Sequence, residues 1–153
     1  MSIQLSQKEQ MYLQDMLKHE ELCITKYANY SQQAQDPELR QLFSQYEEHE
    51  RQHHNSITQL LQGQQPSMSA GQQRSQSGSQ VAGRSGLANQ SDAQLCADAL
   101  TTEKFISGAY DMAIFESVQP AVRQTLQHIQ KDEQQHGEGI FNYMHQHGMY
   151  QVQ

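Results

Sequence analysis

The sequence predicts an all-α fold, in which two related helical hairpins form a four-helix bundle and a long flexible crossover joins them. Three observations indicate this arrangement. Four segments carry apolar residues at the three- and four-residue spacing of helices that face a core. A stretch dominated by Gln, Ser and Gly separates the second segment from the third. The two halves of the chain also align without a gap when Gln7 is placed on Gln90.

Local sequence signals mark where three of the helices begin. Ser6 is followed three residues later by Glu9, which is the capping-box pattern of a helix N-terminus. Asp36 and Pro37 supply an N-cap and a first-turn proline for the second helix, and Pro120 opens the fourth in the same way. The four helices are expected at about 6–34, 37–62, 91–118 and 120–147.

The segment 64–90 has a composition that cannot bury enough apolar surface to form a core, so we expect a flexible crossover there. Fully extended, it reaches beyond the ~40 Å length of a helix of about 26 residues. It can therefore return the chain along the whole bundle, and the second and third helices then run parallel. Short turns within each half and one long crossover between the halves are the ferritin-like arrangement. We expect residues 1–153 to form a single domain of this kind.

Charge and hydropathy exclude several classes of function. The formal net charge is −7, and nothing resembles the basic stripe of a nucleic-acid-binding surface. No apolar run approaches the ~20 residues of a membrane span, and the N-terminus has no signal-peptide pattern. We therefore expect an intracellular protein without nucleic-acid or membrane partners. The two cysteines, Cys23 and Cys96, are too few for a disulfide scaffold and are expected to be reduced.

Polar residues recur at matching core positions of the two halves. They are Glu20, Glu50 and His53 in the first half, and Glu103, Glu133 and His136 in the second. Each helix thus directs one carboxylate at the core, and two helices add an imidazole three residues later on the same face. Four buried carboxylates require compensating cations or protons, and two divalent ions balance them in charge.

One Glu from each of two helices, with Glu-x-x-His from each of the other two, is the ligand pattern of di-iron and di-manganese carboxylate proteins. We therefore expect two divalent metal ions, iron or manganese, held by these six residues. The alternatives are a metal-free buried polar network, which is stable only when every polar group has a partner, and an inherited metal site that is no longer filled.

The run His49-Glu50-x-x-His53 also matches the H-E-x-x-H motif, in which two histidines bind the zinc of a metalloprotease. The repeat speaks against a zinc protease, because Asp132 stands at the position that matches His49. Only Glu50 and His53 keep their counterparts. A dinuclear carboxylate centre therefore remains the favoured interpretation.

Two tyrosines lie two turns beyond the ligands of the first and third helices, on the same helix faces. Tyr27 follows Glu20, and Tyr110 follows Glu103. They could donate hydrogen bonds that orient the carboxylate ligands. Packing in the core explains them equally well, so both alternatives stay open at this point.

The segments KHEELCITKYANY and SQYEEHERQHHNSI resemble the Coat F family of spore-coat proteins, which is similar to ferritins and rubrerythrins in fold. The six residues proposed as ligands match those of bacterioferritin-type centres one for one. The resemblance implies a spore-coat or sporulation-associated protein whose partners are other coat proteins or copies of itself. It also implies an alternative, a di-iron oxidase or peroxide-scavenging enzyme. Rubrerythrins carry a further Glu one turn after the third-helix ligand, and Ile106 stands there in this chain, which speaks against a rubrerythrin-type cycle.

Overall fold

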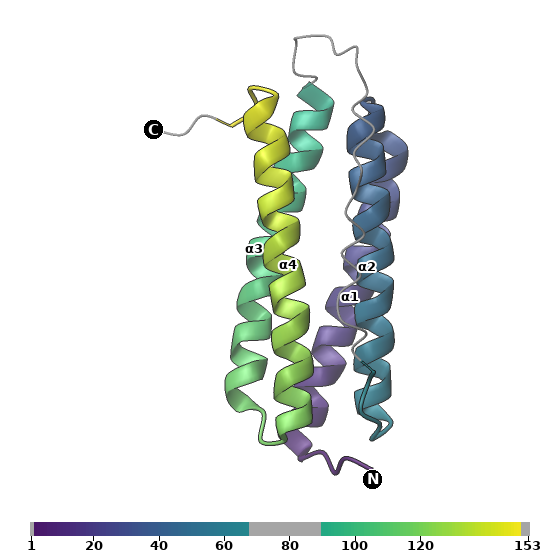
Figure 1. Cartoon of the computed structure of the whole chain (residues 1–153), viewed down its shortest axis with the longest axis vertical. Coiled ribbons are helices and arrows are strands. Elements are labelled where there is room, and N and C mark those ends of the chain that lie inside the picture. The colour runs from purple at the N-terminus through teal and green to yellow at the C-terminus, as the bar shows by residue number, and fades with distance from the viewer. Residues whose placement is uncertain (1, 68–89, 151–153) are drawn as a thin grey trace.

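The computed structural model describes residues 2–67 and 90–150, and these residues form four helices and no strand (Figure 1). The helices are α1 (Gln7–Gln33), α2 (Pro37–Leu61), α3 (Gln90–Glu116) and α4 (Pro120–Gln146). The predicted all-α bundle is confirmed, and each helix ends within about two residues of its expected boundary. Most of the expected crossover at 64–90 lies outside the described residues, and the single domain stays a prediction.

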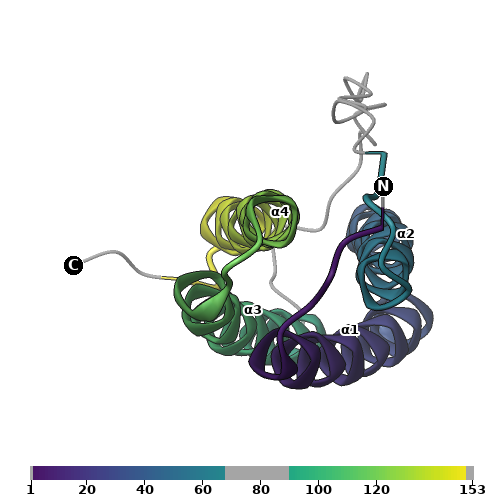
Figure 2. The same ribbon diagram turned by 90° about the horizontal axis from the view of Figure 1, so that it is seen from below.

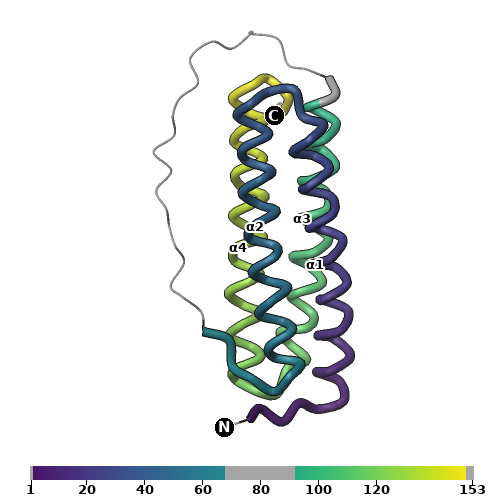
Figure 3. Tube along the Cα trace, turned by 90° about the vertical axis from the view of Figure 1, so that its right-hand side faces the viewer, coloured from purple at the N-terminus to yellow at the C-terminus, as the bar shows by residue number. Residues whose placement is uncertain are grey.

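The helices pack as two antiparallel hairpins, α1 with α2 and α3 with α4. In Figures 1 and 3, α2 and α3 run in the same direction, as the sequence predicts. Across the bundle, α1 contacts α3 and α2 contacts α4. Figure 2, which looks along the helices, therefore shows α1 and α4 at opposite corners. Within the described residues, no helix has the length and apolarity that a membrane span requires.

Helix starts follow the expected local chemistry. The Ser6 hydroxyl accepts a hydrogen bond from the Glu9 amide at 3.0 Å, and the Glu9 carboxylate accepts one from the Ser6 amide at 2.9 Å. The Asp36 side chain caps α2 by accepting from the Glu38 amide at 3.2 Å. These contacts satisfy amide groups that have no partner inside the helix.

Each hairpin also holds the turn of the other through carboxylates at matching repeat positions. Glu9 of α1 accepts hydrogen bonds from the backbone amides of residues 118–119, at 2.9 and 2.8 Å, where α3 turns into α4. Asp92 of α3, which is the repeat counterpart of Glu9, accepts from the amides of residues 35–36 at 2.9 and 3.0 Å. The internal repeat therefore extends to the contacts that fix the ends of the hairpins relative to one another.

The apolar core consists of two clusters, and a polar layer lies between them. One cluster contains Leu13, Met16, Ile57, Ile106, Tyr110 and Leu126, together with Cys23. The other contains Tyr27, Phe43, Tyr46, Ile140 and Tyr143, together with Cys96. Along α1, Glu20 lies between Met16 of the first cluster and Tyr27 of the second. Both cysteines are buried and free.

Candidate metal centre

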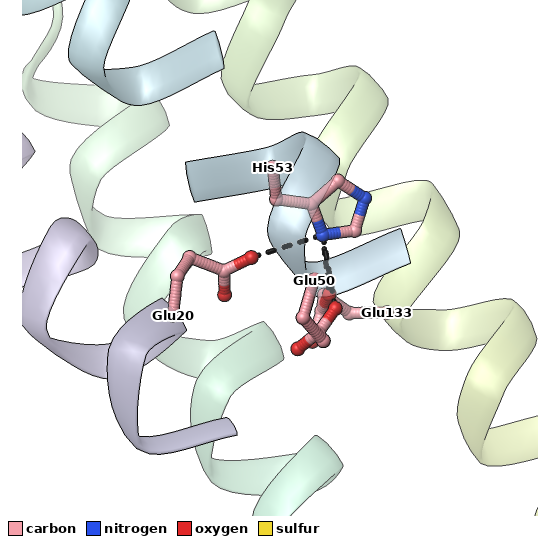
Figure 4. Close-up of side chains that lie close together, drawn as sticks. All are labelled: Glu20, Glu50, His53 and Glu133. Carbon is pink, nitrogen blue, oxygen red and sulfur yellow. Dashed lines mark hydrogen bonds and ion pairs between the residues drawn. The ribbon is translucent and has the colours of Figure 1, made fainter. Parts of the chain in front are cut away.

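The six residues that the sequence singles out meet in the polar layer, each with at most 3% of its surface exposed. Their ligand atoms form two groups, each within 4.8 Å: Glu20, Glu50, His53 and Glu133, and Glu50, Glu103, Glu133 and His136. Figure 4 shows the first group, with side chains from α1, α2 and α4 converging. Glu50 and Glu133 belong to both groups. This sharing is the arrangement that two neighbouring metal ions with bridging carboxylates require.

The spacing in the first group fits the ligands of a single cation. The Nδ1 atom of His53 lies 2.9 Å from Glu20 Oε1, 3.0 Å from Glu50 Oε1 and 2.9 Å from Glu133 Oε1. One ring nitrogen carries at most one proton, so it cannot donate a hydrogen bond to all three oxygens. Neighbouring ligand atoms of a six-coordinate ion with bonds of about 2.1 Å lie ~3 Å apart. These three distances therefore match a shared cation better than a hydrogen-bond network.

The second group is more open. The Nδ1 atom of His136 lies 3.1 Å from Glu103 Oε2, 3.6 Å from Glu50 Oε1 and 4.0 Å from Glu133 Oε1. The two groups thus use the same residue types at matching positions but differ in how tightly the histidine approaches the carboxylates.

Most carboxylate oxygens of the two groups lack a hydrogen-bond donor. Six of their oxygens are buried and accept no hydrogen bond: Glu20 Oε2, Glu103 Oε1, and both oxygens of Glu50 and of Glu133. A buried acceptor without a donor costs about 1–3 kcal/mol, and more when it is charged. A metal-free polar network would have to satisfy these atoms, and it does not. Divalent cations would satisfy them all, so the residues present fit the expected metal pair.

The pKa values show the electrostatic cost of the cluster without metal. Burial, together with the neighbouring carboxylate of Glu50, raises the pKa of Glu20 to about 7. The same causes hold the pKa of Glu133 well above its ordinary value. Burial also acts to raise the pKa of Glu50, but the adjacent Glu133 carboxyl and His53 ring outweigh it and lower that pKa to about 2. Protons therefore take the place of cations when none is bound.

The outer nitrogens of the two histidines have different partners. His53 Nε2 lies 2.8 Å from Asp132 Oδ2, whereas His136 Nε2 lies 2.9 Å from His49 Nδ1. Each partner immediately precedes a shared glutamate, and the two partners occupy matching positions in the repeat. Such contacts orient a ligand histidine, and a carboxylate partner also makes it a stronger ligand. Sequence reasoning noted this pair only as a mismatch, although its place beside the shared glutamates could have identified it.

His49 also bears on the zinc-protease interpretation. No group of close ligand atoms in residues 2–67 and 90–150 contains both His49 and His53. The two rings turn instead to different partners on α4. This geometry speaks against one zinc ion held by the H-E-x-x-H motif.

The two tyrosines differ although they occupy matching positions. The Tyr27 hydroxyl donates a hydrogen bond to Glu103 Oε2. The Tyr110 hydroxyl is fully buried and has no hydrogen-bond partner. Tyr27 therefore contacts a candidate ligand, and Tyr110 packs in an apolar cluster.

Tyr46 also contacts a candidate ligand, although the sequence did not predict it as a residue of the site. Its ring stacks on that of His136 with 4.1 Å between centroids. Gly139 permits this position, because a Cβ atom there would overlap the Tyr46 hydroxyl. Tyr46 thereby restricts rotation of the His136 ring.

Comparisons with known proteins place the chain in a family. The model of the Coat F domain matches residues 8–64 and 91–153. The chain belongs to the Coat F family. The two matched segments begin at equivalent positions of the internal repeat, so they coincide with its two halves. None of the curated proteins matches this Coat F chain.

A solved structure shares the fold. It is the crystal structure of a two-domain protein from Anabaena variabilis that contains DJ-1/ThiJ/PfpI-like and ferritin-like domains. The TM-score is 0.73 at 18% sequence identity, over 97% of the Coat F chain and 40% of the other chain. At that identity the likeness shows the fold alone. The Coat F chain is a ferritin-like four-helix bundle.

Proposed function

We propose that this Coat F chain binds two divalent metal ions, iron or manganese, and serves as a metal-stabilised structural component of the spore coat. The observation that carries the proposal is the sharing of Glu50 and Glu133 between two buried ligand groups. The six carboxylate oxygens without hydrogen bonds support it, because a metal pair removes their desolvation cost.

A metal pair at this place would join all four helices. The first position takes Glu20 from α1, two residues from α2, and Glu133 from α4. The second takes Glu103 from α3, two residues from α4, and Glu50 from α2. Ions that bind the folded chain and not the unfolded one add their binding free energy to the stability of the fold. Metal binding would thus lock the two hairpins together, which suits a protein of a durable assembly.

Membership in the Coat F family supports a place in the coat. The partners we propose are other coat proteins or further copies of the chain. Large apolar side chains that stay exposed on α1 and α3 support such association. They are Met11, Leu22, Phe105, Met112 and Phe115, each at least half exposed.

A ferroxidase or peroxide-scavenging activity is the second candidate. The observation in its favour is a cavity between α3 and α4 whose lining includes the ligands Glu103 and Glu133. A small molecule could reach the metals there. Turnover of peroxide or ferrous iron by the loaded protein, above that of free metal, would favour this activity over a purely structural role.

Metal content tests the proposal. The full chain, purified without chelator and loaded anaerobically with Fe²⁺ or with Mn²⁺, is expected to hold two ions per chain by elemental analysis. The double variant Glu50→Ala/Glu133→Ala should hold none while keeping its helical circular dichroism spectrum. Glu47→Ala is the matched control on α2, because Glu47 pairs with Arg51 at the surface and belongs to neither group. A wild type that takes up no metal, or a double variant that still holds two ions, contradicts the proposal.

A further inference from the structure

The two hairpins differ in the groove between their helices. Between α3 and α4 lies a cavity of about 460 Å³ that runs from exposed residues, Lys104 and Gly108 among them, to the buried carboxylates of Glu103 and Glu133. Side chains of the candidate metal centre therefore form part of its wall. The cavity connects the surface of the bundle to the polar layer.

The matching groove of the first hairpin ends short of the centre. The pocket between α1 and α2 is lined by Glu21, Ile24, Thr25, Arg51, His54 and Asn55. None of the six candidate ligands is among these residues. Glu20 and Glu50, which are the counterparts of Glu103 and Glu133 in the repeat, lie behind this wall and are fully buried.

Small residues at matching repeat positions explain the difference. Where the first hairpin has Ile24, Thr25 and His54, the second has Ser107, Gly108 and Gly137 at the equivalent positions. The α1–α2 groove also holds a pocket, of about 530 Å³, but Ile24, Thr25 and His54 stand in its wall, and no candidate ligand lines it. At the equivalent positions of the α3–α4 groove these side chains are reduced to one hydroxymethyl group and two hydrogen atoms, and there the wall includes Glu103 and Glu133.

Neither glycine is required by the fold. Among the described residues, positive φ angles occur only at Gly63 and Gly148, so the backbone at Gly108 and Gly137 accepts any L residue. A Cβ atom at Gly137 would make ordinary contacts, 3.8 Å from Leu100 Cδ1, and one at Gly108 would have nothing within 4 Å. Glycine inside a helix costs about 0.5–1 kcal/mol relative to alanine. What the two glycines provide is open space.

The chemistry of this wall suits a hydrated cation. The carboxylates of Asp111 and Glu103 outnumber the single ammonium group of Lys104 even when Glu133 carries a proton. Gln130, Gln134 and Ser107 add neutral oxygen atoms of the kind that replace water around Mn²⁺ and similar ions. A cleft lined by an excess of one charge concentrates ions of the opposite charge.

We propose that the α3–α4 groove is the route by which divalent cations enter and leave the metal centre, and that the α1–α2 groove is closed to them. Ions would arrive first at the position formed by Glu103 and His136. The proposal rests on the proposed metal binding and adds to it the path that the ions take. It predicts that blocking the α3–α4 groove slows both the uptake and the release of metal ions, and that the number of ions finally bound does not change.

Blocking variants with a matched control test the route. Gly137→Leu and Gly108→Leu place a side chain in the α3–α4 groove, and His54→Leu places the same side chain at the position that matches Gly137. Co²⁺ binding to the full chain is followed by stopped-flow absorbance under argon, and release is followed after excess EDTA. Both glycine variants should slow uptake and release by at least about tenfold, which corresponds to a barrier about 1.4 kcal/mol higher. His54→Leu should keep the wild-type rates, and all chains should end at two Co²⁺.

The release rate separates a blocked route from a damaged centre. A damaged centre loses its ions faster and fills incompletely, whereas a blocked route slows both directions equally. Wild-type rates in both glycine variants, or faster release, would overturn the route while leaving the metal centre in place. Absence of Co²⁺ uptake by the wild type would overturn the centre and the route together.

Discussion

The contact between Asp132 and His53 leads to a quantitative prediction. Asp132 Oδ2 lies 2.8 Å from His53 Nε2, on the far side of the ring from the three carboxylates that face Nδ1. Asp132→Asn keeps the shape and an oxygen acceptor but removes the negative charge. Loss of such a carboxylate partner typically lowers metal affinity 10- to 100-fold, or about 1.4–2.7 kcal/mol. We expect this loss at one of the two metal positions, the one that contains His53.

The assay is an anaerobic titration of the full chain with Mn²⁺ by isothermal calorimetry, fitted to two binding steps. In Asp132→Asn one step should weaken by the stated factor and the other should weaken less, because the second position has His136 and not His53 as its histidine. The matched variant His49→Asp gives His136 a carboxylate partner like the one that Asp132 gives His53, and it should strengthen the position that contains His136. Unchanged affinity in Asp132→Asn, or equal weakening of both steps, would refute the role assigned to Asp132.

Three further changes have defined outcomes. Glu133→Met replaces a fully buried carboxyl group, whose two oxygens accept no hydrogen bond, by an apolar side chain of similar size. The metal-free protein should therefore gain about 1–3 kcal/mol by urea unfolding, whereas added Mn²⁺ should no longer raise its melting temperature. Burial acts to raise the pKa of Glu9, but backbone hydrogen bonds from Gln119 and Ser6 outweigh it and hold that pKa below its ordinary value. This carboxylate therefore stabilises the fold fully above about pH 4.5 and loses that effect as the pH falls through its lowered pKa. Glu9→Gln should cost about 1–2 kcal/mol at pH 7 and make the unfolding free energy less dependent on pH below 4.5, and a wild-type-like pH profile would contradict this. Gly139→Ala should displace the Tyr46 ring and lower the melting temperature by several degrees. If the ultraviolet difference spectrum of the wild-type tyrosines does not change when metal is added, this would argue against the stacking of Tyr46 on His136.

The sequence was informative about local capping signals and about the carboxylates that recur in both halves. Helix ends follow from local signals such as Ser6 with Glu9, and these depend only on neighbouring residues. The six candidate ligands could be singled out because a carboxylate inside an apolar stripe is costly, and the same cost at matching positions of both halves is hard to attribute to chance. Helical phase then places each of them on the face of its helix that points to the core.

The sequence was not sufficient to predict contacts between side chains of different helices. His49 and Asp132 contact ligand histidines of the other hairpin, and such a contact depends on how the hairpins are rotated against each other. Tyr27 and Tyr110 are the same residue at matching positions, yet one donates to a ligand and the other does not. Periodicity gives the face of a helix on which a residue lies, but it does not give the distance to an atom on a neighbouring helix.

The most direct test of the dinuclear centre is anomalous diffraction from crystals of the chain loaded with Fe²⁺ or Mn²⁺, recorded at the absorption edge of the metal. We expect two peaks per chain in the core, about 3.5–4 Å apart, with Glu50 and Glu133 between them. Glu20 and His53 should flank one peak, and Glu103 and His136 the other. A core without any peak in a protein that has retained its fold, or one peak between His49 and His53, would contradict the dinuclear centre.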